Sequence, residues 1–144
     1  MNCTMNPKQR DDFLLDIHVG ILSLNQPHRG PLSTPVWYWY EPGGHLWFET
    51  QPDSRKGRLL DIGTRISLCV QDEKPPYAYV SIEGPVIEIA EDDFDQHQVP
   101  MACRYLGEKA GREYLASLTP SEWKRYIVKP ERWSTFNGSA DVGK

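Results

Sequence analysis

The residues best suited to chemistry form the basic segment 54–58, Ser-Arg-Lys-Gly-Arg, just after an apolar run that ends at Thr50. Ser54 is a residue type that commonly begins a helix, and the first turn of a helix presents free N–H groups and a partial positive charge. Arginine can bind two phosphate oxygens at once, and lysine adds a mobile charge. The segment therefore predicts a phosphate site. A helix cap with solvated basic side chains is the alternative.

A second candidate is the aromatic run at residues 35–40, Pro-Val-Trp-Tyr-Trp-Tyr. Successive side chains of a strand point to opposite faces. The run therefore sends Val36 and the two tyrosines to one face, and the two tryptophans to the other. One face could form the interior of a barrel, and the other a dimer surface or a support for a flat ring. Ordinary core and interface packing would account for the same residues.

Metal sites and the common catalytic motifs are not indicated. The four histidines have no mutual metal-ligand spacing, and the sequence contains no P-loop, G-x-G-x-x-G, G-x-S-x-G or H-E-x-x-H motif. The three cysteines form no C-x-x-C pair, which argues against a thiolate zinc site or a disulfide framework and fits a reducing compartment. The acidic run 91–93 is typical of a solvated helix start.

The elements that must position these residues follow from hydrophobic periodicity. Helical patterns cover 8–17, 51–62, 92–106 and 108–118, and strand patterns cover 19–24, 33–40, 45–50, 65–71, 77–90 and 123–129. A bulge or bend is expected at Gly84-Pro85, and a loose tail at 136–144. Because sequential strands usually pair, the predicted fold is mainly β with helical additions: one antiparallel, six-stranded split β-barrel domain over residues 1–144.

Composition narrows the classes of partner. The chain has 144 residues, 39% of them hydrophobic, with 16 Lys and Arg against 20 Asp and Glu, a net charge of −4. General binders of nucleic acid or of anionic membranes are basic, so both functions become improbable. No apolar run approaches the roughly 18 residues of a membrane span. We therefore expect a cytoplasmic protein.

The order of these features resembles a known family. Pro-Val-Trp-Tyr at 35–38 is followed by a Pro-Gly-Gly turn, a strand ending Glu-Thr at 49–50, Ser-Arg-Lys at 54–56, and Ile-Ser-Leu-Cys-Val-Gln at 66–71. This series resembles the pyridoxamine 5′-phosphate oxidase-like family, the split β-barrel oxidoreductases that use a flavin or the deazaflavin F420. The resemblance is good over roughly residues 10–90 and looser beyond.

The resemblance implies a homodimer with two cofactors, FMN or alternatively F420, in clefts between the subunits. By position, Pro35, Val36, Trp37 and Tyr38 would supply the strand edge that holds the ring. Glu49 and Thr50 would flank it, and Ser54, Arg55 and Lys56 would hold the cofactor phosphate. Tyr79 and Val80 would reach in from the partner chain, and Trp133 would cover the ring.

One departure limits the implied function. True pyridoxamine phosphate oxidases carry an Arg-x-His element near the C-terminus, and no histidine here has an arginine two residues before it. The segment 30–38 resembles a branch in which many members use F420, whereas Ser-Arg-Lys suits FMN. The sequence therefore predicts an oxidoreductase that transfers hydride to or from a small organic substrate, and not a true pyridoxamine phosphate oxidase. A non-catalytic flavin-binding protein and a structural dimer with an empty pocket are the alternatives.

Overall fold

Alternating apolar and polar residues along the strands build the barrel. In β5 (Arg65–Asp72), Ile66, Leu68 and Val70 are buried, and the residues between them are exposed. The same period of two recurs in β4 (Leu46–Thr50). Because a strand turns every second side chain to the same side, these buried faces meet in one core.

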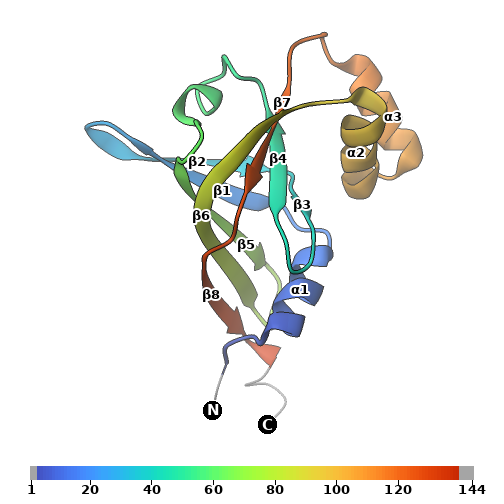
Figure 1. Cartoon of the computed structure of the whole chain (residues 1–144). Coiled ribbons are helices and arrows are strands. Elements are labelled where there is room, and N and C mark those ends of the chain that lie inside the picture. The colour runs from blue at the N-terminus through green and yellow to red at the C-terminus, as the bar shows by residue number, and fades with distance from the viewer. Residues whose placement is uncertain (1–2, 140–144) are drawn as a thin grey trace.

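The computed structural model describes residues 3–139 (Figure 1). Their eight strands form an antiparallel sheet in the order β2-β1-β5-β6-β7-β4-β3, with β8 paired to β6. The other elements are α1 (Pro7–Leu15), β1 (Gly20–Gln26), β2 (Arg29–Val36), β3 (Trp39–Tyr40), the 3-10 turn η1 (Gly57–Leu59), β6 (Ala78–Glu91), the π-helical turn η2 (Phe94–Gln98), α2 (Val99–Leu106), α3 (Glu108–Ser117), β7 (Lys124–Val128) and β8 (Arg132–Asn137).

The predicted fold class is confirmed: the chain is a mainly antiparallel β protein with a few helices, a split β-barrel. Residues 3–139 contain eight strands where six were expected, for two reasons. The predicted strand 33–40 is divided at Trp37 and Tyr38 into β2 and β3. β8 is an addition that local patterning did not indicate.

The long strand β6 holds the barrel together. It pairs with β5 and β8 over its first half and with β7 over its second half. The irregularity in β6 lies between Val86 and Glu88, not at Gly84-Pro85 as expected. Gly84 is needed for another reason, since a Cβ there would stand 1.9 Å from the Lys129 carbonyl oxygen. The chain after β7 therefore crosses β6 at a point where only glycine fits.

Two other segments differ from the sequence-based expectation. Residues 26–31, which lie between two predicted strands, contain a tight hairpin in which Gln26 pairs with Arg29 and His28 adopts a positive φ of 59°. The start of the expected loose tail is also ordered. Gly138 is buried, and its N–H donates to the Tyr77 carbonyl oxygen at 2.7 Å. Residues 140–144 of that predicted tail lie outside the described residues.

The predicted helix over 51–62 is wrong, because the segment forms a compact turn that ends in η1. The Ser54 hydroxyl donates to the Gln51 carbonyl oxygen at 2.6 Å and accepts from the Gly57 N–H at 3.1 Å. A Cβ at Gly57 would stand 2.2 Å from the Gln51 carbonyl oxygen. Side-chain hydrogen bonds of this kind compete with helix formation, which explains the difference.

The helices gather beside the barrel (Figure 1). Pro100 lies in the first turn of α2, where a missing N–H costs nothing, and Gly107 joins α2 to α3 with a φ of 87°. Arg104 of α2 donates to the Leu15 and Asp16 carbonyl oxygens at 3.0 Å each and so ties α2 to the end of α1. No helix within residues 3–139 is long and apolar enough to cross a membrane.

Candidate functional site

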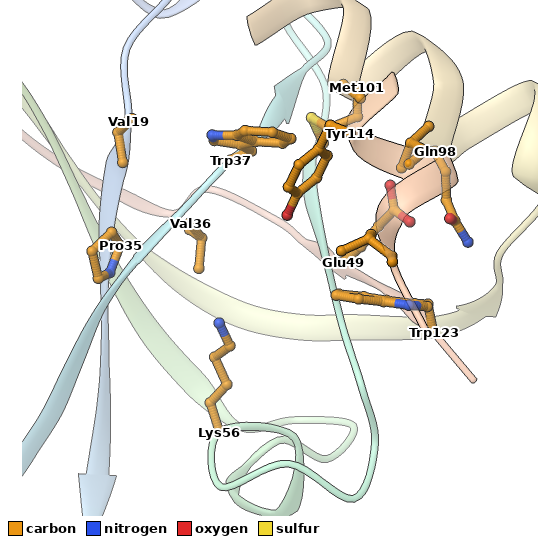
Figure 2. Close-up of a pocket in the computed structure, with 13 residues that line it drawn as sticks. Val19, Pro35, Val36, Trp37, Glu49, Lys56, Gln98, Met101, Tyr114 and Trp123 are labelled. Atoms are coloured by element: carbon orange, nitrogen blue, oxygen red, sulfur yellow. The ribbon is translucent and has the colours of Figure 1, made fainter. Parts of the chain in front are cut away.

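A pocket of about 260 Å³ lies between the barrel and the helical cap, by which we mean η2, α2 and α3 (Figure 2). Five of the twelve predicted site residues line it: Pro35, Val36, Trp37, Glu49 and Lys56. Eight further residues line it that sequence reasoning missed: Val19, Gln98, Met101, Ala102, Tyr114, Leu115, Leu118 and Trp123. Most of the missed residues belong to the helical cap or adjoin it. The sequence indicates the apolar face of these helices, but it does not indicate where that face packs on the barrel.

Trp37 forms a rigid aromatic wall of the pocket. Its ring stacks on Tyr105 at 4.9 Å between centroids with 7° between the planes, and it also meets Tyr114 at 5.6 Å. The Tyr105 hydroxyl donates to the His18 carbonyl oxygen at 2.6 Å and accepts from the Tyr38 N–H at 3.2 Å. The loop between β2 and β3 therefore places this ring at a fixed position, with large apolar area available to a flat ligand.

Lys56 supplies a cation to the same pocket (Figure 2). Among residues 3–139 its ammonium group takes part in none of the hydrogen bonds or ion pairs that hold the other basic side chains, and burial lowers its pKa from the usual value. A half-buried ammonium without an acidic partner is suited to an anionic ligand group.

The neighbours of Lys56 in the basic segment do not line the pocket. Ser54 uses its hydroxyl within the turn, where Thr50 Oγ1 lies 3.3 Å from Ser54 Oγ. Arg55 points toward the end of β1 and donates from Nη2 to Gln26 Oε1 at 3.0 Å. Lys56 thus lines the pocket, whereas Thr50, Ser54 and Arg55 do not. Whether the latter three contact a cofactor phosphate stays a prediction.

Tyr38 and Val80 have fully buried side chains in the barrel core. The Tyr38 hydroxyl donates to the Leu14 carbonyl oxygen at 2.8 Å, and burial raises its pKa well above the usual value. Only backbone groups of these two residues could therefore meet a ligand. The Tyr38 ring faces inward, so its predicted part in the strand edge that holds the cofactor ring stays a prediction for its backbone.

Tyr79 and Trp133 lie on β6 and β8, away from this pocket. Tyr79 stacks on Phe136 with centroids 6.3 Å apart, and Trp133 carries the Arg10 guanidinium 4.1 Å above its ring. Trp133 packs against the core of its own chain and does not line the pocket described here, so its predicted role over the ring stays a prediction. The role of Tyr79 toward a partner chain stays a prediction.

A pair of acidic groups stands at the pocket wall. The Glu49 carboxyl hydrogen-bonds that of Asp92, and burial, this hydrogen bond and the charge of Asp92 together raise the pKa of Glu49 to about 9. Arg125 acts in the opposite direction. Burial and the neighbouring charge therefore favour the neutral form of the Glu49 carboxyl, on the side of the pocket formed by β4.

Several solved structures of similar shape show the fold. A conserved hypothetical protein of Mycobacterium tuberculosis matches with a TM-score of 0.73 and 23% identity, over 99% of this chain and 90% of that chain. An F420 reductase matches with a TM-score of 0.60 and 22% identity, over 86% and 94%. A FAD-binding protein of Mesorhizobium loti matches with a TM-score of 0.65 and 18% identity, over 92% and 93%. No curated protein matches the chain.

The family comparison covers nearly all of the barrel. The model of the family described as Pyridoxamine 5′-phosphate oxidase matches residues 7–136, from the first residue of α1 into β8. Together with the split-barrel topology, this match shows that the chain belongs to the pyridoxamine 5′-phosphate oxidase family.

Proposed function

We propose that this protein is an oxidoreductase that binds FMN, or alternatively F420, and transfers hydride to or from a small organic substrate. The observation that carries the proposal is the pocket itself, where the fixed ring of Trp37 and the unpartnered cation of Lys56 face one space. Membership of the family supports it, and so does the resemblance of the fold to an F420 reductase and to FAD-binding proteins.

The residues present fit a flavin-type group. A flavin or deazaflavin needs a flat apolar surface for its ring and a cation for its phosphate, and the pocket offers both. When bound, such a group supplies the hydride chemistry, while the protein positions it and excludes water. Trp37 would support the ring, Lys56 would bind the phosphate, and Met101 of the helical cap would close the apolar side.

A second copy of the chain would complete the site. The pocket of about 260 Å³ falls below the roughly 300–1,000 Å³ typical of ligand sites, so one chain encloses only part of a large cofactor. Next to it, exposed Pro35, Ile21 and Cys69 stand side by side across β2, β1 and β5. An apolar strip that continues from the pocket over the outer face of the sheet suits a homodimer interface.

Oxidation of pyridoxamine phosphate itself is not part of the proposal. A substrate with its own phosphate needs a second cationic clamp, and the Arg-x-His element that provides it in true oxidases is missing from this sequence. The pocket offers Lys56 as its one basic side chain among the described residues. A small organic substrate without a phosphate fits this charge distribution better.

A non-catalytic flavin-binding protein is the second candidate. It is favoured by fold neighbours described only as FAD-binding, among them proteins of Mycobacterium smegmatis and Mesorhizobium loti. The same Trp37 and Lys56 would serve a protein that stores cofactor or senses its redox state. Tight binding without turnover would favour this candidate.

Spectroscopy of the purified protein tests both candidates. We expect a flavin or deazaflavin absorption band in the purified protein, or its appearance on titration with FMN or F420. Reduction of the bound cofactor by an electron donor, followed by reoxidation with an organic acceptor, would distinguish catalysis from storage. A protein that binds neither FMN nor F420 would refute the proposal and point to a structural dimer.

A further inference from the structure

The acidic run at residues 91–93 begins a helical turn as expected, since Asp93 caps η2, but Asp92 is not solvated. Asp92 follows β6 and turns inward, so that its side chain is only 2% exposed, whereas the Glu91 side chain is 85% exposed. In this position Asp92 meets Glu49 of β4, whose carboxyl lines the pocket. One carboxyl group from β4 and one from the residue after β6 thus meet behind the pocket wall.

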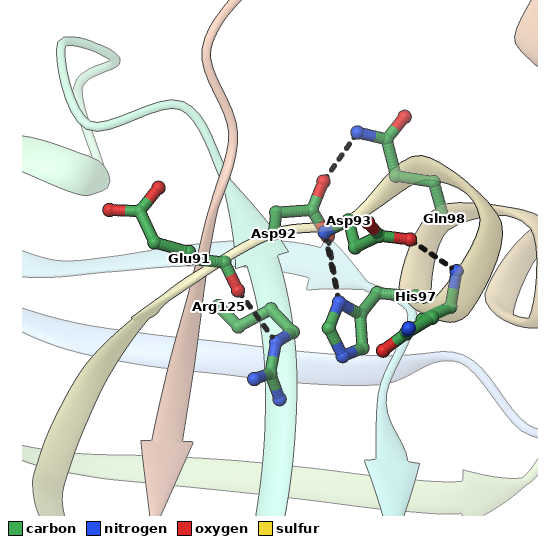
Figure 3. A network of polar contacts seen from close by, with 7 residues as sticks. Glu91, Asp92, Asp93, His97, Gln98 and Arg125 are labelled. Carbon is green, nitrogen blue, oxygen red and sulfur yellow. Dashed lines mark hydrogen bonds and ion pairs between the residues drawn. The ribbon is translucent and has the colours of Figure 1, made fainter.

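The hydrogen bonds around Asp92 call for a proton on this pair. Gln98 donates its side-chain amide to Asp92 Oδ2, and Oδ1 is buried without a donor from any described residue (Figure 3). Two ionised carboxylates cannot hydrogen-bond each other, because neither carries a hydrogen. One proton between Glu49 and Asp92 supplies the missing donor.

The charged groups around the pair leave it with an excess of negative charge. Arg125 of β7 is a cation whose charge lowers the pKa of Glu49, and its Nε donates to the Glu91 carbonyl oxygen at 3.1 Å. His97 Nδ1 lies 3.8 Å from Asp92 Oδ1. This nitrogen accepts the Asp93 N–H at 2.9 Å and therefore carries no hydrogen of its own. Burial and Arg125 lower the pKa of His97, so it is neutral at pH 7. Lys56 faces the same pocket from the basic segment. One cation beside two carboxyl groups favours retention of a proton.

We propose that Glu49 and Asp92 share one proton and that Glu49 is the proton donor and acceptor for a substrate in the pocket. This inference rests on the proposed function. When a C=X bond of the substrate accepts hydride from the reduced flavin or deazaflavin, the two electrons leave negative charge on X. The Glu49 O–H bond then breaks, an X–H bond forms, and the pair is left with two negative charges.

A second hollow, which is separate from the pocket at Trp37, is lined by His97 and Arg125. His97 lies 3.8 Å from Asp92 and borders this hollow, so the pair stands between the hollow and the pocket. Glu49 acts as proton donor on the pocket side. A pKa of about 9 for Glu49 fits this role, because the proton is held at neutral pH and released to a more basic group.

Infrared titration of the ligand-free protein tests proton sharing independently of any cofactor. In the wild type we expect a protonated-carboxyl C=O band that persists at about pH 7 and disappears near the pKa of about 9. Glu49→Gln removes the band. Asp92→Asn removes the neighbouring charge, so the band disappears at lower pH. Glu88→Gln, at an exposed position of β6, leaves it unchanged.

Steady-state kinetics test whether Glu49 acts as the proton donor and acceptor. With cofactor bound, Glu49→Gln should lower kcat by about 10²- to 10⁴-fold and remove the basic limb of its pH profile, a loss larger than any change in the Kd for FMN. Glu49→Asp should restore part of the activity. Absence of the carboxyl band at neutral pH, or its presence in Glu49→Gln, would overturn proton sharing. An unaltered pH profile in Glu49→Gln would overturn the catalytic role. Failure to bind FMN and F420 would refute the proposed function, while the infrared result would still decide whether the proton is shared.

Discussion

Trp37 and Tyr105 lie parallel, with their ring centroids 4.9 Å apart, and this contact joins the barrel to the helical cap. Trp37 follows β2, whereas Tyr105 belongs to α2. The hydroxyl of Tyr105 reaches past the stacked rings to the backbone of His18 and Tyr38. One side chain thus fixes both the ring that lines the pocket and the helix that covers it.

Tyr105→Phe should therefore loosen the cap while preserving the stack. The change removes a hydroxyl that makes two hydrogen bonds to backbone groups, so we expect the free energy of unfolding to fall by about 1–2 kcal/mol. Urea denaturation measures the loss. Tyr114→Phe is the control, because the ring of Tyr114 is 42% exposed and its hydroxyl makes no hydrogen bond among the described residues. Equal losses in the two variants would contradict this account.

Lys56→Ala should weaken FMN binding about 10- to 100-fold, the loss expected for a charge-assisted hydrogen bond to phosphate. Riboflavin lacks the phosphate, so its affinity should change little. Arg55→Ala is the matched variant, since its guanidinium binds Gln26 outside the pocket. Titrations of FMN and riboflavin against the three proteins give the comparison. A larger FMN loss in Arg55→Ala than in Lys56→Ala would place the phosphate elsewhere.

Glu49 should make folding stability depend on pH. Its pKa rises from 4.5 to about 9 in the folded protein, so its contribution to stability is complete below about pH 4.5 and is lost as the pH rises through 9. Between these values, unfolding releases a proton, and the free energy of unfolding falls by up to about 1.4 kcal/mol per pH unit.

The glutamine side chain in Glu49→Gln cannot ionise, so this variant should lose the pH dependence of stability. It should be more stable than the wild type at alkaline pH. Denaturation curves from about pH 5 to about pH 9 measure the slope, with Glu88→Gln expected to behave as the wild type. Identical slopes in the wild type and in Glu49→Gln would show that Glu49 is ionised in the folded protein at neutral pH.

Ile21→Glu should dissociate the proposed homodimer. Ile21 is 37% exposed at the centre of the strip formed with Pro35 and Cys69, and a buried charge there would have no partner. Sedimentation equilibrium should give twice 16.6 kDa for the wild type and 16.6 kDa for the variant. Ile62→Glu, at a 58% exposed position away from this strip, is the control. A wild type that stays monomeric at micromolar concentration would refute the dimer.

The sequence predicted best where local periodicity decides the structure. Val36, Tyr38 and Tyr40 alternate with Trp37 and Trp39, and the first three are buried while the tryptophans are half-buried, as expected. The segment after Thr50 failed because the Ser54 hydroxyl hydrogen-bonds the turn and Gly57 packs against backbone, which hydrophobic pattern does not record. The Glu49–Asp92 pair and the lining by α2 and α3 could not be predicted, since each depends on how distant segments dock.

β6 ties together the two halves of the barrel, because Ala78–Glu83 lies between β5 and β8 while the second half of the strand pairs with β7. Neither half can separate while β6 persists, so amide hydrogens of the barrel should exchange with solvent only through global unfolding. The helical cap is held mainly by side chains such as Tyr105 and Arg104, and it can open alone. The residence time of a bound ligand is then set by how long the helical cap stays closed, and not by how long the barrel stays folded.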